Sequence, residues 1–245
     1  MAAHPVDQAK GGGLMEGIMN VWEWLTDPAH WQGPNGIPVR TLQHLYISGA
    51  AMVIAIVLAF PVGMIIGHFK RFGGFVTNLG NVGRAIPTFA LLIIFASTDL
   101  IGVGDLAAIL ALAIFAIPPL LTNTYVGVRD VDANVSEGAK GMGMTDSQVI
   151  GRVELPTALP MIGAGLRTTT VQVVATATLA ALVGGGGLGR YVVDGFALQD
   201  VTLMMSGVIL VSALSVGVEA ILALIQRYLT PRPLRSRESG SAKPA

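Results

Sequence analysis

Cysteine is absent from this chain of 245 residues, and charged residues make up only 12% of it. Without cysteine the chain has no disulfide bond, no thiol catalysis and no thiolate metal ligand, and nothing else in the sequence predicts a metal site or a cofactor. The G-x-x-x-x-G-K-[ST] phosphate-binding loop is also missing, so any nucleotide chemistry through such a loop has to come from another subunit. No cluster of basic residues indicates binding to nucleic acid.

Hydrophobic residues, in contrast, make up 52% of the chain and gather in five long runs. The runs lie near residues 44–67, 74–97, 106–128, 161–187 and 201–229. At a rise of about 1.5 Å per residue, each run is long enough to cross a hydrocarbon core of about 30 Å. We therefore predict an all-α membrane protein with five transmembrane helices.

Basic residues give the expected orientation, because Lys and Arg near span ends are retained in the cytoplasm. With the N-terminus outside, the inner segments hold Lys70, Arg71, Arg129, Lys140, Arg152, Arg227, Arg232, Arg235, Arg237 and Lys243. The outer segments hold only Lys10, Arg40 and Arg190. We predict a multi-pass protein of the cell inner (plasma) membrane, with the N-terminus outside and the C-terminus in the cytoplasm.

The chain divides into three parts. Residues 1–40 form an N-terminal tail in which Leu14 to Leu25 reads as an amphipathic helix lying in the outer interface, where tryptophan is favoured. A peripheral helix packed on protein is the alternative. Residues 41–229 form the transmembrane domain, and residues 230–245 form a short cytoplasmic tail.

A polar loop, here defined as residues 130–160, separates the third and fourth apolar runs. Asp132 or Asn134 can cap a short helix, which Gly143 ends by adopting a left-handed conformation. Thr145 begins a second helix, and Gln148 three residues later completes a capping box.

Pro156 is expected to end that second helix. Two short helices turned about a glycine make a compact knob suited to docking. A simple connector between two spans is the alternative.

The polar loop resembles the cytoplasmic coupling loop of ABC importer permeases, whose pattern is Glu-Ala-Ala, three residues, Gly, nine residues, Ile, any residue and Leu-Pro. The matching positions are Glu137, Gly138, Ala139, Gly143, Val153, Leu155 and Pro156. Gly138 replaces Ala and Val153 replaces Ile, and both changes keep the side chain small or β-branched. The resemblance implies that these residues form a coupling helix that docks on a separate ABC ATPase subunit, so this chain itself is not an enzyme.

Three further segments, Arg84–Leu92, Ile117–Tyr125 and Leu179–Gly195, resemble permeases for osmoprotectants of the glycine betaine, carnitine and choline type. This likeness spans residues 40 to 229 and implies a type I ABC importer permease. It also implies a quaternary-ammonium substrate, a second permease subunit in a homo- or heterodimer, an external solute-binding protein and contact with membrane lipid.

Three ionisable residues, Arg84, Arg167 and Glu219, fall within the apolar runs. Because a charge inside a membrane is costly, each is expected to face the bundle interior and find a partner. We predict that Glu219 pairs with Arg84 or Arg167 as a structural ion pair, and a substrate site is the alternative.

Polar residues in the spans suggest a translocation path. Thr168, Gln172 and Thr176 lie four residues apart on the fourth span, and Pro87 and Thr88 interrupt the second. We expect Pro87, Thr88, Gln172 and Thr176 to line the path. The alternative for the threonines is that they bond to carbonyls of their own helix.

Small residues recur every fourth position along the first span, where they predict a close helix–helix contact. They are Ala51, Ala55, Ala59, Gly63 and Gly67. Prolines in the second and third spans predict kinks or breaks there.

Two other functions compete with osmoprotectant import. One is an ABC permease for methionine or another amino acid, which would share the same loop. The other is a stand-alone secondary transporter, although five spans without an internal repeat fit inverted-repeat architectures poorly.

Overall fold

The computed structural model describes residues 14–70 and 73–229, and every regular element in these ranges is a helix. The α-helices are α1 (Leu14–Thr26), α2 (Ile37–Phe69), α3 (Gly73–Ala85), α4 (Thr88–Ala96), α5 (Asp105–Arg129), α6 (Ala133–Gly141), α7 (Asp146–Val149), α8 (Leu155–Thr176), α9 (Gly189–Leu198) and α10 (Val201–Leu229). Shorter elements are η1 (Pro28–Trp31), the π-helix η2 (Ile150–Glu154) and the 3-10 helix η3 (Ala177–Val183). Residues 1–13 and the 230–245 tail lie outside the described ranges.

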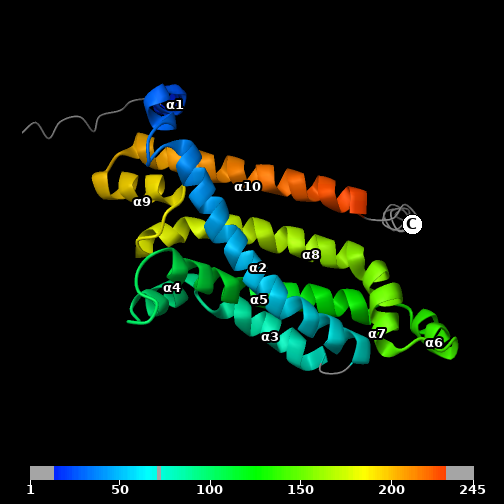
Figure 1. The fold of residues 1–245 in the computed structure, drawn as a ribbon. Helices are drawn as coiled ribbons and strands as arrows, with labels where there is room; N and C mark the ends of the chain where they lie inside the picture. Colours follow the sequence, from blue (N-terminus) through cyan, green and yellow to red (C-terminus); the bar gives the residue numbers. More distant parts are fainter. Residues whose placement is uncertain (1–13, 71–72, 230–245) are drawn as a thin grey trace, which may run out of the picture.

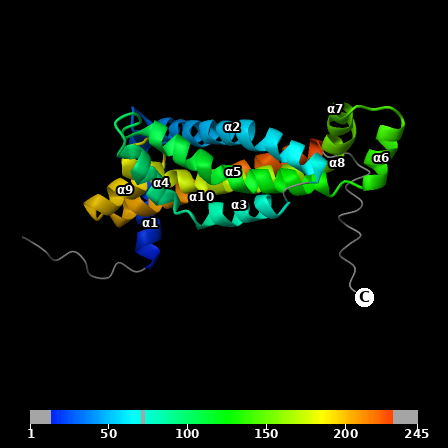
Figure 2. The same ribbon diagram turned by 90° about the horizontal axis from the view of Figure 1, so that it is seen from below.

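The long helices α2, α5, α8 and α10 run lengthwise through the molecule (Figure 1). α5 packs against both α2 and α8, and α8 in turn packs against α10. The short helices α6 and α7 lie at one end of the bundle, whereas α1, α4 and α9 gather at the other end, as the perpendicular view also shows (Figure 2). The polar loop thus stands apart from the N-terminal helix.

Four helical stretches in the described part of the chain are long and apolar enough to cross a membrane. They are Ile37–Phe69, Asp105–Arg129, Asp146–Val183 and Val201–Tyr228. A fifth single-helix span is not confirmed, because the apolar run 74–97 is divided between α3 and α4. Pro87 takes an extended conformation between them (φ −65°, ψ 116°). The residue before a proline, here Ile86, disfavours the helical conformation, and this accounts for the break.

The two adjacent prolines of the third apolar run behave differently. Pro118 and Pro119 both lie inside α5, which remains one helix of 25 residues. The side chains of Thr122 and Asn123 donate hydrogen bonds to the carbonyls of Pro118 and Pro119 at 2.8 and 2.7 Å. The predicted break is therefore found in the second apolar run and not in the third.

The small residues of α2 are buried against α5, as the sequence predicts. They are Ala51, Ala55, Ala59, Gly63 and Gly67. A Cβ added at Gly63 would lie 2.8 Å from Thr124 Cβ, and one added at Gly67 would lie 2.7 Å from Val128 Cβ. The two backbones therefore approach too closely for any larger side chain at these two positions.

Helix α1 packs against α10 and has two unlike faces. Val21 is buried, whereas Met15, Ile18, Met19 and Trp22 are exposed. The exposed set follows helical spacing and forms one apolar face. The helix therefore packs on protein, as a peripheral helix would, and also has the exposed apolar face that a helix lying in a membrane interface requires.

Glycines reverse the chain after η3. Gly184 and Gly187 take positive φ values of 80° and 93°. The freed N–H groups find side-chain acceptors: Gly186 N donates to Asp105 Oδ1 at 2.8 Å, and Gly187 N donates to Gln43 Oε1 at 3.1 Å. These bonds join the turn to α5 and α2.

Candidate functional site

The polar loop lies at the end of a helix that is longer than a membrane is thick. Residues Asp146–Val183 form a continuous helical stretch of 38 residues. At about 1.5 Å per residue this stretch is about 57 Å long, against about 30 Å for a hydrocarbon core. One end must therefore project, and the polar composition of the first turns identifies the α7 end as the projecting one.

The first helix of the polar loop, α6, begins and ends at the residues that its sequence indicates. Asp132 is the N-cap, and its Oδ1 accepts a hydrogen bond from Asn134 N at 2.9 Å. After the helix ends, Gly143 takes φ 88°, and its N–H donates to Lys140 O at 2.9 Å. A side chain at Gly143 would meet no atom within 4 Å, so the backbone conformation alone favours glycine there.

The second helix, α7, begins with a complete capping box. Thr145 N donates to Gln148 Oε1 at 2.9 Å, and Gln148 N donates to Thr145 Oγ1 at 3.4 Å. Two N–H groups that a helix start leaves without an intrahelical acceptor are thereby satisfied. The box fixes the direction in which the chain leaves the turn at Gly143.

The prediction that Pro156 ends this helix is wrong. Pro156 lies in the first turn of α8, and the π-helix η2 joins α7 to α8 without a break. A proline ring clashes with the carbonyl four residues earlier, and a π-helical bulge is one way in which a helix widens to accommodate such a side chain. The polar loop therefore continues directly into a spanning helix.

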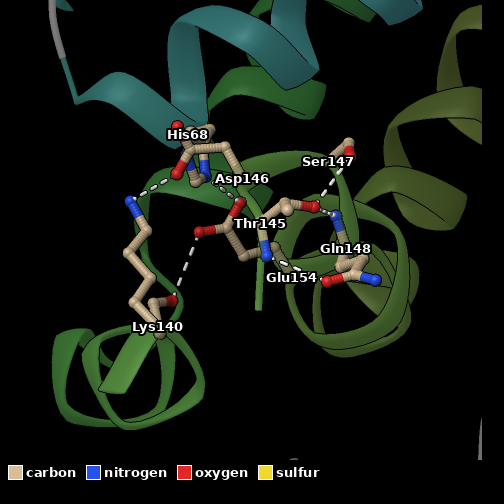
Figure 3. A network of polar contacts seen from close by, with 8 residues as sticks. His68, Lys140, Thr145, Asp146, Ser147, Gln148 and Glu154 are labelled. Atoms are coloured by element: carbon tan, nitrogen blue, oxygen red, sulfur yellow. Dashed lines mark hydrogen bonds and ion pairs between the residues drawn. The ribbon is translucent and has the colours of Figure 1, made fainter. Parts of the chain in front are cut away.

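A buried polar cluster anchors the base of the loop on α2 (Figure 3). His68 Nδ1 lies 2.8 Å from Glu154 Oε2, and Ser136 Oγ donates to Glu154 Oε1 at 3.2 Å. On the exposed side, Lys140 Nζ lies 2.8 Å from Asp146 Oδ1. Lys140, and to a lesser degree His68, hold the pKa of the Asp146 carboxyl below its usual value.

The seven motif residues separate into two groups in the structure. Glu137, Gly138 and Gly143 are exposed at the tip of the polar loop. The other four are buried or half-buried: Ala139, Val153, Leu155 and Pro156. Ala139 is buried within the polar loop, so its side chain is not part of the exposed surface.

Sequence reasoning missed two exposed apolar residues of the polar loop, Val135 and Met142. Met142 is 80% exposed, although it is a large apolar side chain on a segment rich in polar residues. Its position between two glycines was the only signal in the sequence. Met142 and Val135 give the exposed surface of the knob an apolar component.

Sequence reasoning also missed His68 and Glu154. These two residues lie 86 positions apart in the chain, so no local pattern indicates that they meet. The signal that the sequence does carry is a glutamate next to Leu155 in a segment that leads into an apolar helix.

Arg167 and Glu219 come together between α8 and α10. Arg167 Nε lies 3.1 Å from Glu219 Oε1, and both side chains are partly exposed. The side chain of Arg84, the other expected partner, lies outside the described residues.

The four residues expected to line a path lie on two separate elements. Pro87 precedes α4 and Thr88 begins it, whereas Gln172 and Thr176 lie near the end of α8. Pro87 and Gln172 are exposed, and Thr88 and Thr176 are half-buried. Thr168, on the same stripe as Gln172, donates to Ala164 O at 3.0 Å, which is the alternative considered for the threonines.

A bundle of long apolar helices, with a capped polar knob projecting from one end, defines the class of multi-pass membrane permeases. Comparison with known proteins agrees with this class. The family model described as binding-protein-dependent transport system inner membrane component matches residues 59–235. The chain belongs to this family.

Curated relatives cover most of the chain. The carnitine transport permease protein OpuCB of Listeria monocytogenes is 40% identical over 202 residues, which cover 82% of this chain and 92% of the relative. The glycine betaine/carnitine/choline transport system permease protein OpuCB of Bacillus subtilis (strain 168) is 38% identical with the same coverage. The choline transport system permease protein OpuBB of Bacillus subtilis (strain 168) is 38% identical over 192 residues, which cover 78% of this chain and 88% of the relative.

Solved structures have the same fold. A chain of the MetNI methionine ABC transporter in an inward-facing conformation matches with a TM-score of 0.71 at 24% identity, covering 84% of this chain and 100% of that chain. A chain of an amino acid ABC transporter matches with a TM-score of 0.59 at 18% identity, covering 78% of this chain and 93% of that chain. At these identities the likeness concerns the fold alone.

Proposed function

We propose that this chain is the transmembrane permease subunit of an ATP-driven ABC importer for quaternary-ammonium osmoprotectants such as glycine betaine, choline or carnitine. The observation that carries the proposal is the capped polar loop with the Glu137-to-Pro156 motif, on a chain that is about 40% identical to permeases named for these solutes. Membership of the permease family supports the transport role, and the names of the relatives support the substrate class.

The exposed tip of the polar loop is the surface that would dock on a separate ATPase subunit. Glu137 offers a carboxylate, Met142 and Val135 offer apolar contacts, and Gly143 sets the angle between α6 and α7. ATP-driven closure of the ATPases would push on this tip, and η2 would pass the displacement directly to α8. Access to the path would thus alternate between the two sides of the membrane.

In this proposal the polar loop and the C-terminus lie in the cytoplasm and the N-terminus lies outside. The distribution of Lys and Arg supports that orientation. α1 and the glycine turn after η3 would then lie at the outer side, where an external solute-binding protein delivers its ligand.

A second permease subunit would complete the path. In the most apolar stretch of α10, only 6% of the residues are buried within the single chain. The polar side chain of Gln172 on α8 is also exposed. Polar groups in membrane helices normally face protein or water and avoid lipid. Pro87, Thr88, Gln172 and Thr176 would then line the path between the two subunits.

The selective cation site belongs to the external binding protein in this proposal. A quaternary ammonium group is recognised by clustered aromatic rings, but aromatic residues make up only 6% of this chain. Trp24 stacks on His30 and meets Tyr191 edge-on, so one of the three tryptophans is already engaged within the protein. The permease itself would contribute little binding energy.

Uptake by the reconstituted complex tests the proposal. We expect ATP-dependent uptake of radiolabelled glycine betaine that excess choline or carnitine reduces and excess methionine does not. Gly143→Pro should abolish uptake while the protein remains in the membrane, because proline cannot adopt φ 88° and lacks the N–H that bonds to Lys140 O. Competition by methionine alone would contradict the substrate class, and wild-type uptake by Gly143→Pro would contradict the role of the loop.

A further inference from the structure

The C-terminal end of α2 carries a histidine that is buried against the polar loop. The side chain of His68 is 1% exposed, and that of Glu154, which lies 2.8 Å away, is 3% exposed. Because a carboxylate oxygen accepts hydrogen bonds, His68 Nδ1 donates in this contact. Both side chains are almost completely buried, so little water can compete for this hydrogen bond.

Glu154 joins three segments through its two carboxylate oxygens. It lies in the π-helix η2, accepts from His68 of α2 on one oxygen and accepts from Ser136 of α6 on the other. Figure 3 shows His68 and Glu154 where α2 meets the polar loop. The polar loop, through Ser136, and the end of α2, through His68, therefore both bond to the buried carboxylate of Glu154.

The other contact of His68 is weaker. Nε2 lies 3.3 Å from Asp146 Oδ1, but it has no hydrogen-bond partner with acceptable alignment. Asp146 is itself exposed and pairs with Lys140, and exposed ion pairs of this kind contribute little. Of the polar contacts of His68, the bond to Glu154 is therefore the one that ties α2 to the loop, beside an apolar cluster that includes Met64 of α2 and Ile150 and Leu155 of the loop.

In the turns of α2 that precede His68, the helix packs closely against α5. Gly67 and Gly63 allow the two helices to approach so closely that a Cβ at either glycine would overlap with α5 side chains. Close-packed helices transmit displacement because their contacts leave little free space. A movement of η2 that reaches His68 is therefore passed to both α2 and α5.

We infer that His68 is a positioning residue that makes α2 move together with the polar loop during transport. It adds a side-chain connection from the loop to α2, beside the two covalent connections that run from α5 into α6 and through η2 into α8. The inference rests on the proposed coupling role of the polar loop.

The test measures solute imported per ATP hydrolysed in proteoliposomes that contain the complete importer and its binding protein. We expect His68→Ala to lower this ratio about fivefold or more, in the range of typical coupling energies between sites. His68→Asn should restore the ratio, because its amide nitrogen can occupy the Nδ1 position and donate to Glu154. His68→Gln should not restore it, because its amide reaches toward the Nε2 position.

His44 provides a matched control on the same helix. It is buried near the other end of α2, and its Nε2 lies 2.8 Å from Val174 O of α8. His44→Ala also removes a buried contact between α2 and a neighbour, but it should lower the thermal stability of the complex without lowering the ratio. An equal loss of the ratio in His44→Ala would overturn the inference, because general loosening of α2 would then explain the effect.

Two further results would also overturn it. One is a wild-type ratio in His68→Ala. The other, which decides the matter if His68→Ala does not assemble, is an equal ratio in His68→Asn and His68→Gln. Gly143→Pro is measured alongside: if it lowers the ratio and His68→Ala does not, only this inference fails, whereas a wild-type ratio in Gly143→Pro is a failure of the proposed function.

Discussion

Arg167 Nε lies 3.1 Å from Glu219 Oε1, so an ion pair joins α8 to α10 within two predominantly apolar helices. α10 contacts the rest of the bundle mainly through α8 and α9, and through α1 at the end away from the polar loop. The pair is therefore well placed to fix how α10 sits on α8.

Removing one member of this pair should destabilise the protein more than removing both. A charge left alone within an apolar helix loses its partner, whereas Arg167→Leu with Glu219→Leu removes both charges together. We expect a coupling energy of about 0.5–3 kcal/mol from the double-mutant cycle. Denaturant unfolding of the four proteins measures it, and strict additivity of the two single changes would contradict a direct interaction.

Gly143→Ala should destabilise the polar loop even though there is space for the new methyl group. The cost is backbone strain at φ 88°, of about 1–2 kcal/mol for a residue with a Cβ. Gly141→Ala is the matched control, because Gly141 lies within α6 and also has no atom near its added Cβ.

In the control, alanine replaces glycine at the last residue of α6 and should stabilise the helix by less than the roughly 1 kcal/mol typical of a helix interior. Amide hydrogen exchange of α6 and α7 reports both changes. Equal protection in the two variants would show that the left-handed turn does not govern the local stability of the loop.

Thr145→Ala should weaken the start of α7 by about 0.5–2 kcal/mol, because it removes the side-chain acceptor for Gln148 N. Ser147→Ala is the control: it removes only an exposed hydroxyl contact with Thr145 and leaves the capping box in place. Faster exchange of the Gln148 amide in the first variant alone is the expected result. The same rate in both variants would mean that the capping box adds no stability.

Gly67→Ala should disturb the contact between α2 and α5. Its Cβ would lie 2.7 Å from Val128 Cβ and 3.0 Å from the Tyr125 carbonyl oxygen, so a helix backbone has to shift. We expect a loss of about 1–3 kcal/mol, as for other overpacked sites. Gly49→Ala on the same helix meets no atom within 4 Å and should lower the melting temperature far less.

Local features of the polar loop could be predicted from the sequence because they depend on few residues. The cap at Asp132, the left-handed Gly143 and the box between Thr145 and Gln148 each involve residues no more than a few positions apart. The small residues of α2 were equally readable, since a regular spacing identifies one face of a helix. The partner of that face, α5, had to come from the structure.

Features that depend on distant contacts were missed or predicted incorrectly. Pro156 is a strong helix breaker in isolation, but the π-helix η2 accommodates it. The inward-facing Ala139 and the His68–Glu154 contact both depend on how the loop folds back on α2. The second apolar run was counted as one span although its proline already predicted a kink or break, and the structure has the break at Pro87.

Site-specific cross-linking tests the central claim most directly, because the chain contains no cysteine of its own. Met142→Cys places a single thiol on the tip of the polar loop, and Leu100→Cys places one at a position that is 93% exposed in the connection between α4 and α5, toward the opposite end of the bundle. With a thiol-to-amine reagent, the account predicts a cross-link from position 142 to the ATPase subunit and none from position 100. A cross-link to the ATPase from position 100, or none from position 142 in the assembled complex, would contradict it.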